Sequence, residues 1–308
     1  MAQGEIMNLF LNLVRETIGI SKIFGLRHAF TRIISFIKIK IEGKRKTHIY
    51  NKLKPTGVVI KEIMGNRMRL DMNDYGIHRD LFIDKIREPV ATAHISKVLS
   101  KDDIVVDLGA NIGYYALIES KICKKVYAIE PVEKNIEFLK SNVELNKCEN
   151  IEIFPMAIGD KPTLALMNIS STSNLHSFYP LQNAVCKKEM EMDTLDNFLK
   201  DKEKPTFVRM DIEGYELKVL HGMKDTLKYV DRLFIEVHAD IMRLNETREF
   251  IDILSNNDFN PELIIHYDQP KFSKVLPNSH LRNIYIGDKG SYEIFFKKNS
   301  IKTNKFYD

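Results

Sequence analysis

The chain of 308 residues is long enough to bury a sizeable core, and its hydrophobic and charged fractions, 44% and 29%, are those of an ordinary globular protein. Its formal net charge of +4 is too small by itself to indicate a protein that binds nucleic acid. Three widely spaced cysteines without a CxxC pair argue against a zinc site or a disulfide framework and fit a reducing cytoplasm, where we expect the protein to be located.

Positive charge is concentrated in the N-terminal segment, residues 1–54. Residues 1–60 carry eleven Lys or Arg against three Asp or Glu. Apolar residues in this segment recur at the spacing i, i+3, i+4 and i+7, which predicts an amphipathic helix with basic residues around it: Phe30, Ile33, Ile34 and Ile37. Such a helix either packs on the main domain or lies on an anionic membrane or a partner protein. Residues 43–54 are predicted to form a polar linker, and neither a signal peptide nor a transmembrane helix is expected.

Residues 55–100 are expected to contain a β-hairpin and a helix that leads into the main domain. The hairpin is predicted from the stretch GVVIKEIMGNRMRLDM, in which apolar and polar residues alternate on both sides of Gly65 and Asn66. The helix is predicted from REPVATAHISKVL, which begins at Arg87.

Strands and helices alternate from residue 101 to residue 290. Strands are predicted at 104–108, 125–129, 151–154, 206–210, 232–237, 261–266 and 281–286. Helices are predicted to begin at 112 and 131, to cover the stretch GYELKVLHGMKDTLKYV, and to span 247–255. This rhythm indicates an α/β fold with a doubly wound, mostly parallel sheet. Residues 291–308 are expected to add a short strand and a basic tail.

The first of these strands runs into a turn that contains two glycines, within the stretch VVDLGANIGYY. In open parallel sheets ligands bind beyond the carboxyl ends of the strands, so four residues of this turn are candidate ligand contacts: Asp107, Gly109, Asn111 and Gly113. Glu130 follows Asp107 by 23 residues, at the tip of the next strand, where a carboxylate can accept hydrogen bonds from both hydroxyls of a ribose. The pair predicts a ligand that contains a nucleoside. Neither GxGxxG nor GxxxxGK[ST] is present, which argues against a dinucleotide site and a P-loop.

These stretches resemble a known family. VVDLGANIGYY with YAIEP resembles the cofactor motifs of class I S-adenosylmethionine-dependent methyltransferases, and with MAIGD, EMDTLDNF, RMDIEGYELKVLHG and IEVH in the same order the chain is similar to the FkbM family over roughly residues 88–266. The resemblance implies a Rossmann-like fold and S-adenosyl-L-methionine as cofactor. The resemblance implies that the amino acid end of this cofactor lies near Asp107, Gly109, Asn111 and Gly113. It implies that the cofactor's ribose lies on Glu130 and its adenine beside Ala157 and Ile158, with Asp160 close by.

Two strand ends supply candidates for the chemistry of methyl transfer. RMDIEGYE places Asp211 and Glu213 just after one strand, and IEVH places Glu236 and His238 on one face at the end of the next. Transfer to a hydroxyl is an in-line displacement that is helped by a base, so we expect Asp211 or His238 to take the proton and Glu213 to orient the acceptor or the base. Alternatively Asp211, Glu213 and His238 hold a divalent metal such as magnesium, although nothing in their spacing demands one.

The FkbM resemblance implies O-methylation of a hydroxyl on a sugar, a glycolipid or another small natural product. The alternative is an RNA methyltransferase that uses the basic N-terminal segment for phosphate contacts. DIEG stands where N-methyltransferases that act on a planar base carry [DN]PP[YF], so nucleic acid is not the expected partner. A third alternative is a scaffold that binds the cofactor without catalysis. It would need an impaired catalytic edge, whereas Asp211, Glu213 and His238 are all present.

Overall fold

The computed structural model describes residues 41–53, 55–182, 184–266 and 274–299. The chain divides after Leu53 into two units, each described by itself. In the first unit residues 41–53 are helical, so the prediction of a polar linker at 43–54 is wrong. This stretch is rich in long, unbranched side chains that favour helices, and Arg45 pairs with Glu42 one turn earlier. The amphipathic helix predicted around Phe30 to Ile37 lies outside the described residues.

The second unit begins with an antiparallel pair of strands, β1 (Val58–Ile63) and β2 (Asn66–Asp71). Met64 and Gly65 form the two-residue turn, both with left-handed backbone (φ 48° and 71°), which matches the twist of a tight hairpin. Helices α3 (Ile77–Asp84) and α4 (Pro89–Val98) follow. Proline at the first position of α4 costs no hydrogen bond, because that N–H would have no partner within the helix.

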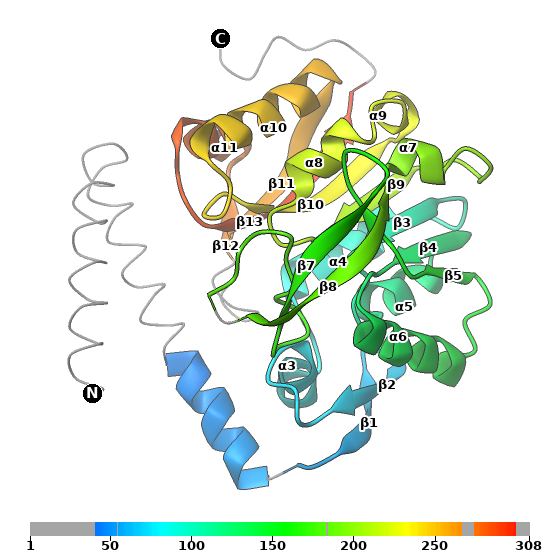
Figure 1. Cartoon of the computed structure of the whole chain (residues 1–308), viewed down its shortest axis with the longest axis vertical. Helices are drawn as coiled ribbons and strands as arrows, with labels where there is room; N and C mark the ends of the chain where they lie inside the picture. The colour runs from blue at the N-terminus through cyan, green and yellow to red at the C-terminus, as the bar shows by residue number, and fades with distance from the viewer. Residues whose placement is uncertain (1–40, 54, 183, 267–273, 300–308) are drawn as a thin grey trace. The chain divides into compact units, whose positions relative to one another are not determined.

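The central sheet has eight strands in the order β12-β11-β13-β10-β9-β3-β4-β5 (Figure 1). Five neighbouring strands run parallel: β10 (Arg232–His238), β9 (Phe207–Met210), β3 (Ile104–Leu108), β4 (Lys125–Ile129) and β5 (Ile151–Phe154). All five residues of β3 are buried, as expected for a mostly apolar strand covered on both faces. The mostly parallel α/β sheet predicted from the sequence is confirmed.

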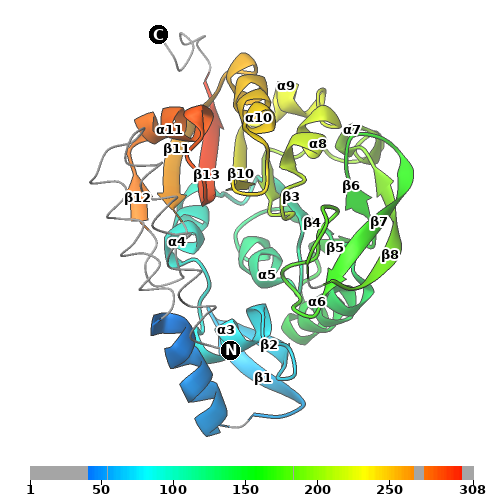
Figure 2. The ribbon, with the colours of Figure 1, turned by 60° about the vertical axis from the view of Figure 1, so that its left-hand side comes forward.

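Helices cover both faces of this sheet. On one face lie α7 (Leu195–Phe198), α8 (Glu216–His221), α9 (Thr226–Tyr229) and α10 (Leu244–Asn256), whose apolar side chains join the main hydrophobic cluster. Helices α4, α5 (Tyr114–Ser120) and α6 (Glu133–Asn146) lie on the other face (Figure 2). The arrangement is doubly wound and Rossmann-like, and it brings the carboxyl ends of the parallel strands to one edge.

Three further strands complete the sheet: β11 (Phe259–His266), β12 (Lys274–Leu276) and β13 (Ser291–Lys298). β13 is antiparallel to both β10 and β11 and lies between them, so the strand expected after residue 290 is an inner strand of the sheet. The strand predicted at 281–286 is wrong, because helix α11 (Leu281–Ile286) occupies this stretch. Its buried residues Leu281 and Ile284 are three apart, at helical spacing, and Gly287 ends the helix with left-handed backbone.

A second sheet of three strands, in the order β6-β8-β7, is inserted between β5 and β9. Its strands are β6 (Ala157–Ile158), β7 (Thr163–Ser170) and β8 (Ala184–Asp193), and none was predicted from the sequence. Figure 2 shows this sheet as a separate layer beside the central one. Met167 and Met190 pack on Val132, which follows β4. The insertion therefore anchors the β7–β8 loop near the carboxyl edge of the central sheet.

Candidate functional site

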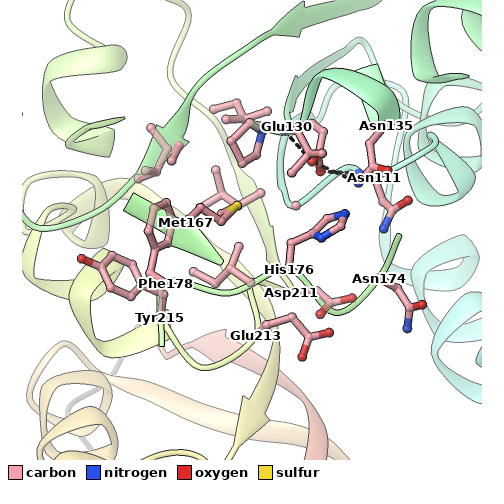
Figure 3. A pocket seen from close by; sticks show the side chains of 18 of the residues that line it. Asn111, Glu130, Asn135, Met167, Asn174, His176, Phe178, Asp211, Glu213 and Tyr215 are labelled. Atoms are coloured by element: carbon pink, nitrogen blue, oxygen red, sulfur yellow. Dashed lines mark hydrogen bonds between the residues drawn. The ribbon is translucent and has the colours of Figure 1, made fainter. Parts of the chain in front are cut away.

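A pocket opens at the carboxyl ends of β3, β4 and β9 (Figure 3). Its walls come from five segments: the glycine-containing turn after β3, residues 129–135, residues 156–158, part of β7 and the β7–β8 loop, and residues 211–215. Three of the four strand ends that the sequence singled out, those of β3, β4 and β9, therefore meet at one cavity. Glu236 and His238, at the end of the fourth, do not line it.

Glu130 lies in the wall of this pocket, held by three N–H donors. The Asn111 backbone N–H donates to Oε2 (2.9 Å), and the Val132 N–H and the Asn135 side-chain amide donate to Oε1 (3.0 and 3.2 Å). Burial raises the pKa of Glu130 to about 7, although these hydrogen bonds pull it down. The carboxylate lies in the pocket wall between the turn after β3 and helix α6 (Figure 3).

Apolar side chains gather on the other side of the pocket. Phe178 and Tyr215 lie with their ring centres 4.9 Å apart, next to Met167 (Figure 3). Ala157 and Ile158, expected beside an adenine, line this region together with Met156 and Ile212. The result is a slot suited to a planar base. Asp160 does not line the pocket, because its carboxylate pairs with Lys218 Nζ at 3.0 Å.

The four candidate residues of the turn after β3 divide into two pairs. Gly109 and Asn111 line the pocket, whereas Asp107 and Gly113 do not. A Cβ at Gly109 (φ 79°) would lie 2.0 Å from the carbonyl oxygen of Asp211, and one at Gly113 (φ 90°) would lie 2.6 Å from Leu139. Both glycines therefore allow close packing of protein on protein, and only Gly109 also borders the cavity.

Arg209 links the end of β3 to Asp211, which follows β9. Its Nη1 donates to Asp107 Oδ1 (2.9 Å) and its Nη2 to Asp211 Oδ2 (3.0 Å), and its guanidinium lies 4.1 Å from the centre of the Tyr115 ring. Burial raises the pKa of Asp107 despite this pairing. Burial would also raise the pKa of Asp211, but the positive charges of Arg209, Arg87 and His238 together outweigh it and hold that pKa below its ordinary value. The sequence analysis did not single out Arg209, although its spacing of two from Asp211 places both on one strand face.

Asp211, Glu213 and His238 lie together, with one ligand atom from each within 4.8 Å of the others. His238 Nδ1 is 2.9 Å from Glu216 Oε1, and Nε2 is 3.4 Å from Glu213 Oε2 and 3.6 Å from Glu236 Oε1. Glu216 was not identified from the sequence, because α8 brings it to His238 only in the fold.

The charges in this cluster differ from residue to residue. Burial would lower the pKa of His238, but the surrounding carboxylates, led by Glu216, outweigh it and raise that pKa well above its ordinary value. Burial raises the pKa of Glu213 to about 8. At neutral pH the cluster therefore holds an imidazolium, a neutral Glu213 and an ionised Asp211. The three residues are close enough to share a divalent cation, but His238 would first have to lose its proton.

Comparison with known proteins identifies related sequences. Residues 107–261 match the family model described as the methyltransferase FkbM domain. Hexuronic acid methyltransferase AglP of Haloferax volcanii is 30% identical over 152 residues, which cover 46% of this chain and 58% of that protein. tRNA (guanine(37)-N(1))-methyltransferase Trm5b of Methanocaldococcus jannaschii is 44% identical over 64 residues, which cover 21% of this chain and 18% of that protein.

Among solved structures, methyltransferase FkbM from Methylobacillus flagellatus is 20% identical, with a TM-score of 0.42 over 64% of this chain and 45% of that chain. The chain thus spans less than two thirds of the length of each of these three proteins.

Proposed function

The chain belongs to the FkbM methyltransferase family, and from this membership we propose that it transfers a methyl group from S-adenosyl-L-methionine to a hydroxyl of a sugar, a glycolipid or another small natural product. The pocket carries the proposal. Its apolar slot suits an adenine, Glu130 suits a ribose, and the ionised Asp211 at its edge suits the positive charge of a sulfonium. Similarity to a hexuronic acid methyltransferase supports a sugar as the acceptor.

S-adenosyl-L-methionine supplies an electrophilic methyl group, which an acceptor oxygen attacks in line with the departing sulfur. The protein has to hold that oxygen in place and receive its proton. Asp211 is the side chain best suited to take the proton, because it is ionised whereas His238 already carries one. Glu213, which is neutral below about pH 8, is suited to donate a hydrogen bond that orients the acceptor.

Two measurements test this proposal. Titration calorimetry with S-adenosylhomocysteine tests the cofactor site, and we expect saturable heat on the folded protein. Transfer of a labelled methyl group from S-adenosylmethionine into cell extracts, read by mass spectrometry, tests the reaction and identifies the acceptor. If neither the cofactor nor its demethylated product gives heat with folded protein, the proposal is refuted.

A divalent cation at Asp211, Glu213 and His238 is a second way to activate the hydroxyl, because it would lower the pKa of the bound acceptor. Activity that survives exhaustive chelation would remove this possibility.

RNA is a second candidate acceptor, favoured by the similarity of 64 residues to a tRNA methyltransferase and by the basic residues at 1–60. Phosphate contacts by Lys and Arg produce affinity that falls steeply with salt. We expect no such binding, because DIEG stands after β9 in place of [DN]PP[YF]. Titration of a labelled RNA across a salt series distinguishes the two acceptors, and tight binding at low salt would favour RNA.

A further inference from the structure

A smaller cavity adjoins the pocket just described. Gly109, Asn111, Asn174 and Asp211 line both cavities, so the two meet beside the catalytic edge. The remaining walls of the smaller cavity include Arg87, Tyr114, Tyr115 and Arg209. Arg87 lies before residues 107–261, the stretch that matches the family domain, and it comes from the turn between α3 and α4.

Buried hydroxyl groups hold the backbone of Arg87 at this cavity. The Arg87 N–H donates to the Tyr114 hydroxyl (3.1 Å), which in turn donates to the Arg87 carbonyl (3.0 Å), and the Thr92 hydroxyl donates to the same carbonyl (2.8 Å). The next residue, Glu88, has left-handed backbone (φ 47°), a strained state for a residue other than glycine. Such strain persists only where the surroundings impose it, and it is frequent at ligand sites.

The charged side chains that line the smaller cavity are two nearly buried guanidinium groups, those of Arg87 and Arg209, and the carboxylate of Asp211. Arg87 is 9% exposed and Arg209 is 4% exposed. Arg209 is engaged by Asp107 and Asp211, as described above. Arg87 contacts the Glu88 carboxylate through Nε, and the Tyr115 hydroxyl donates to the same carboxylate (2.6 Å). The two tyrosines of the VVDLGANIGYY stretch thus fix the arginine and its neighbour in place.

The polar atoms around this cavity fit a group that carries both a carboxylate and a hydrogen-bond donor. The Arg87 guanidinium suits a carboxylate, since a charge-assisted hydrogen bond to a buried arginine is among the stronger polar contacts in proteins. The side-chain oxygen of Asn111 is buried and has no hydrogen-bond partner among the described residues. Because a buried acceptor without a partner is costly, this oxygen is expected to receive a hydrogen bond from a ligand.

We propose that the smaller cavity is a carboxylate-binding subsite in which Arg87 is the cation. The inference rests on the proposed function, because two participants in that reaction can carry a carboxylate. One is the α-amino acid end of the cofactor, whose nucleoside would lie in the larger pocket. The other is an acidic sugar bound as methyl acceptor. Both would reach Arg87 past Gly109 and Asp211, where the two cavities meet.

The first arm of the test compares two cofactor analogues by titration calorimetry. 5′-Methylthioadenosine has the nucleoside and thioether of S-adenosylhomocysteine but lacks the amino acid end. If Arg87 holds the cofactor's carboxylate, Arg87→Gln weakens S-adenosylhomocysteine binding about 10- to 100-fold and leaves methylthioadenosine binding unchanged within about twofold. Arg87→Lys is expected to lose less, because it keeps the charge. Arg67→Gln, which removes an exposed arginine on β2, is the matched control and should change neither.

The second arm titrates the S-adenosylhomocysteine complex with p-nitrophenyl glucuronide and p-nitrophenyl glucoside. The first sugar has a carboxylate at C6 where the second has a hydroxymethyl group. If that carboxylate occupies the subsite, Arg87→Gln leaves S-adenosylhomocysteine affinity intact and weakens only the glucuronide. A carboxylate subsite requires that Arg87→Gln selectively weaken the ligand that carries the carboxylate. The proposal is overturned if the substitution changes the affinity of none of the four ligands. It is also overturned if the substitution weakens S-adenosylhomocysteine and methylthioadenosine equally, or the glucuronide and the glucoside equally. Absence of S-adenosylhomocysteine binding to the unaltered protein would instead refute the proposed function.

Discussion

Asp211 and His238 lie within a few ångströms of each other, yet their charge states give them different abilities to accept a proton. Positive charges led by Arg209 keep Asp211 ionised, and carboxylates led by Glu216 keep His238 protonated. We therefore predict that Asp211→Asn lowers turnover about 10²- to 10⁴-fold with S-adenosylhomocysteine affinity changed little, because the loss is that of a general base. Turnover and calorimetric affinity are measured in parallel. His238→Gln is the comparison and should cost less turnover, and unchanged turnover in Asp211→Asn would remove this residue from the mechanism.

Glu130 should make cofactor binding depend on pH. Burial raises its pKa to about 7 in the unliganded protein, and ribose hydroxyls donate to the ionised carboxylate. Because the ligand prefers the deprotonated form, affinity for S-adenosylhomocysteine rises with pH through 7 and levels off about one unit above it. At pH 6 it should be about tenfold weaker than on the plateau. Calorimetry between pH 5.5 and 8.5 measures this.

Controls assign the titration to Glu130. Glu213 and His176 also line the pocket, so a slope alone would not identify the group. Glu130→Gln has no carboxyl to titrate there and should flatten the profile. Asp160→Asn should keep the full slope, because Asp160 does not line the pocket. A slope that persists in Glu130→Gln would contradict the assignment.

Among the elements, buried parallel strands were the most predictable. β3 and β4 are short, mostly apolar runs bounded by turns, as expected for strands covered on both faces, whereas β5 places Glu152 between two isoleucines. β7 and β8 escaped prediction because only two residues of each strand are buried and β8 is largely polar, so neither shows a clear apolar period. Leu281–Ile286 was wrongly predicted to be a strand, because the stretch LRNIYI is too short and has too few apolar residues to distinguish a helical period from a strand period.

Some residues of the candidate site could likewise be predicted from the sequence and others could not. Asp211, Glu213 and His238 could be singled out because strand ends meet at one edge of a parallel sheet. Glu216 and Arg87 could not, because helix α8 and the α3–α4 turn bring them there through packing that no spacing encodes. Phe178 also escaped, because it belongs to the unpredicted β7–β8 insertion.

The contact between the turn after β3 and the turn after β9 predicts a specific intolerance at Gly109. Gly109 and Gly57 both have left-handed backbone (φ 79° and 66°), but a Cβ at 109 would lie 2.0 Å from the Asp211 carbonyl oxygen whereas one at 57 meets nothing within 4 Å. Gly57→Ala should cost roughly 1–2 kcal/mol of unfolding free energy, the cost of the backbone conformation alone. Gly109→Ala adds the clash and should cost about 1–3 kcal/mol more. Urea unfolding compares them, and equal costs would contradict the close approach.

At the scale of the whole molecule, both cavities belong to the second unit. Among the described residues, those that line the cavities lie between Ile77 and Tyr215, and residues 54–308 contain the main hydrophobic cluster. Within the described part of the chain, no helix has the length and apolar character to cross a membrane.

We accordingly predict that a chain of residues 54–308 folds cooperatively and binds S-adenosylhomocysteine within about twofold of the full chain, because a binding constant depends on the groups that contact the ligand. Calorimetry on both chains tests this, and a large loss of affinity would show that residues 1–53 act on the pocket.

Sedimentation with anionic vesicles at low and high salt then separates the two roles left open for the basic segment. Salt-sensitive binding by the full chain alone indicates a membrane surface, since screening weakens attraction between exposed charges, whereas binding by neither chain favours packing on the protein.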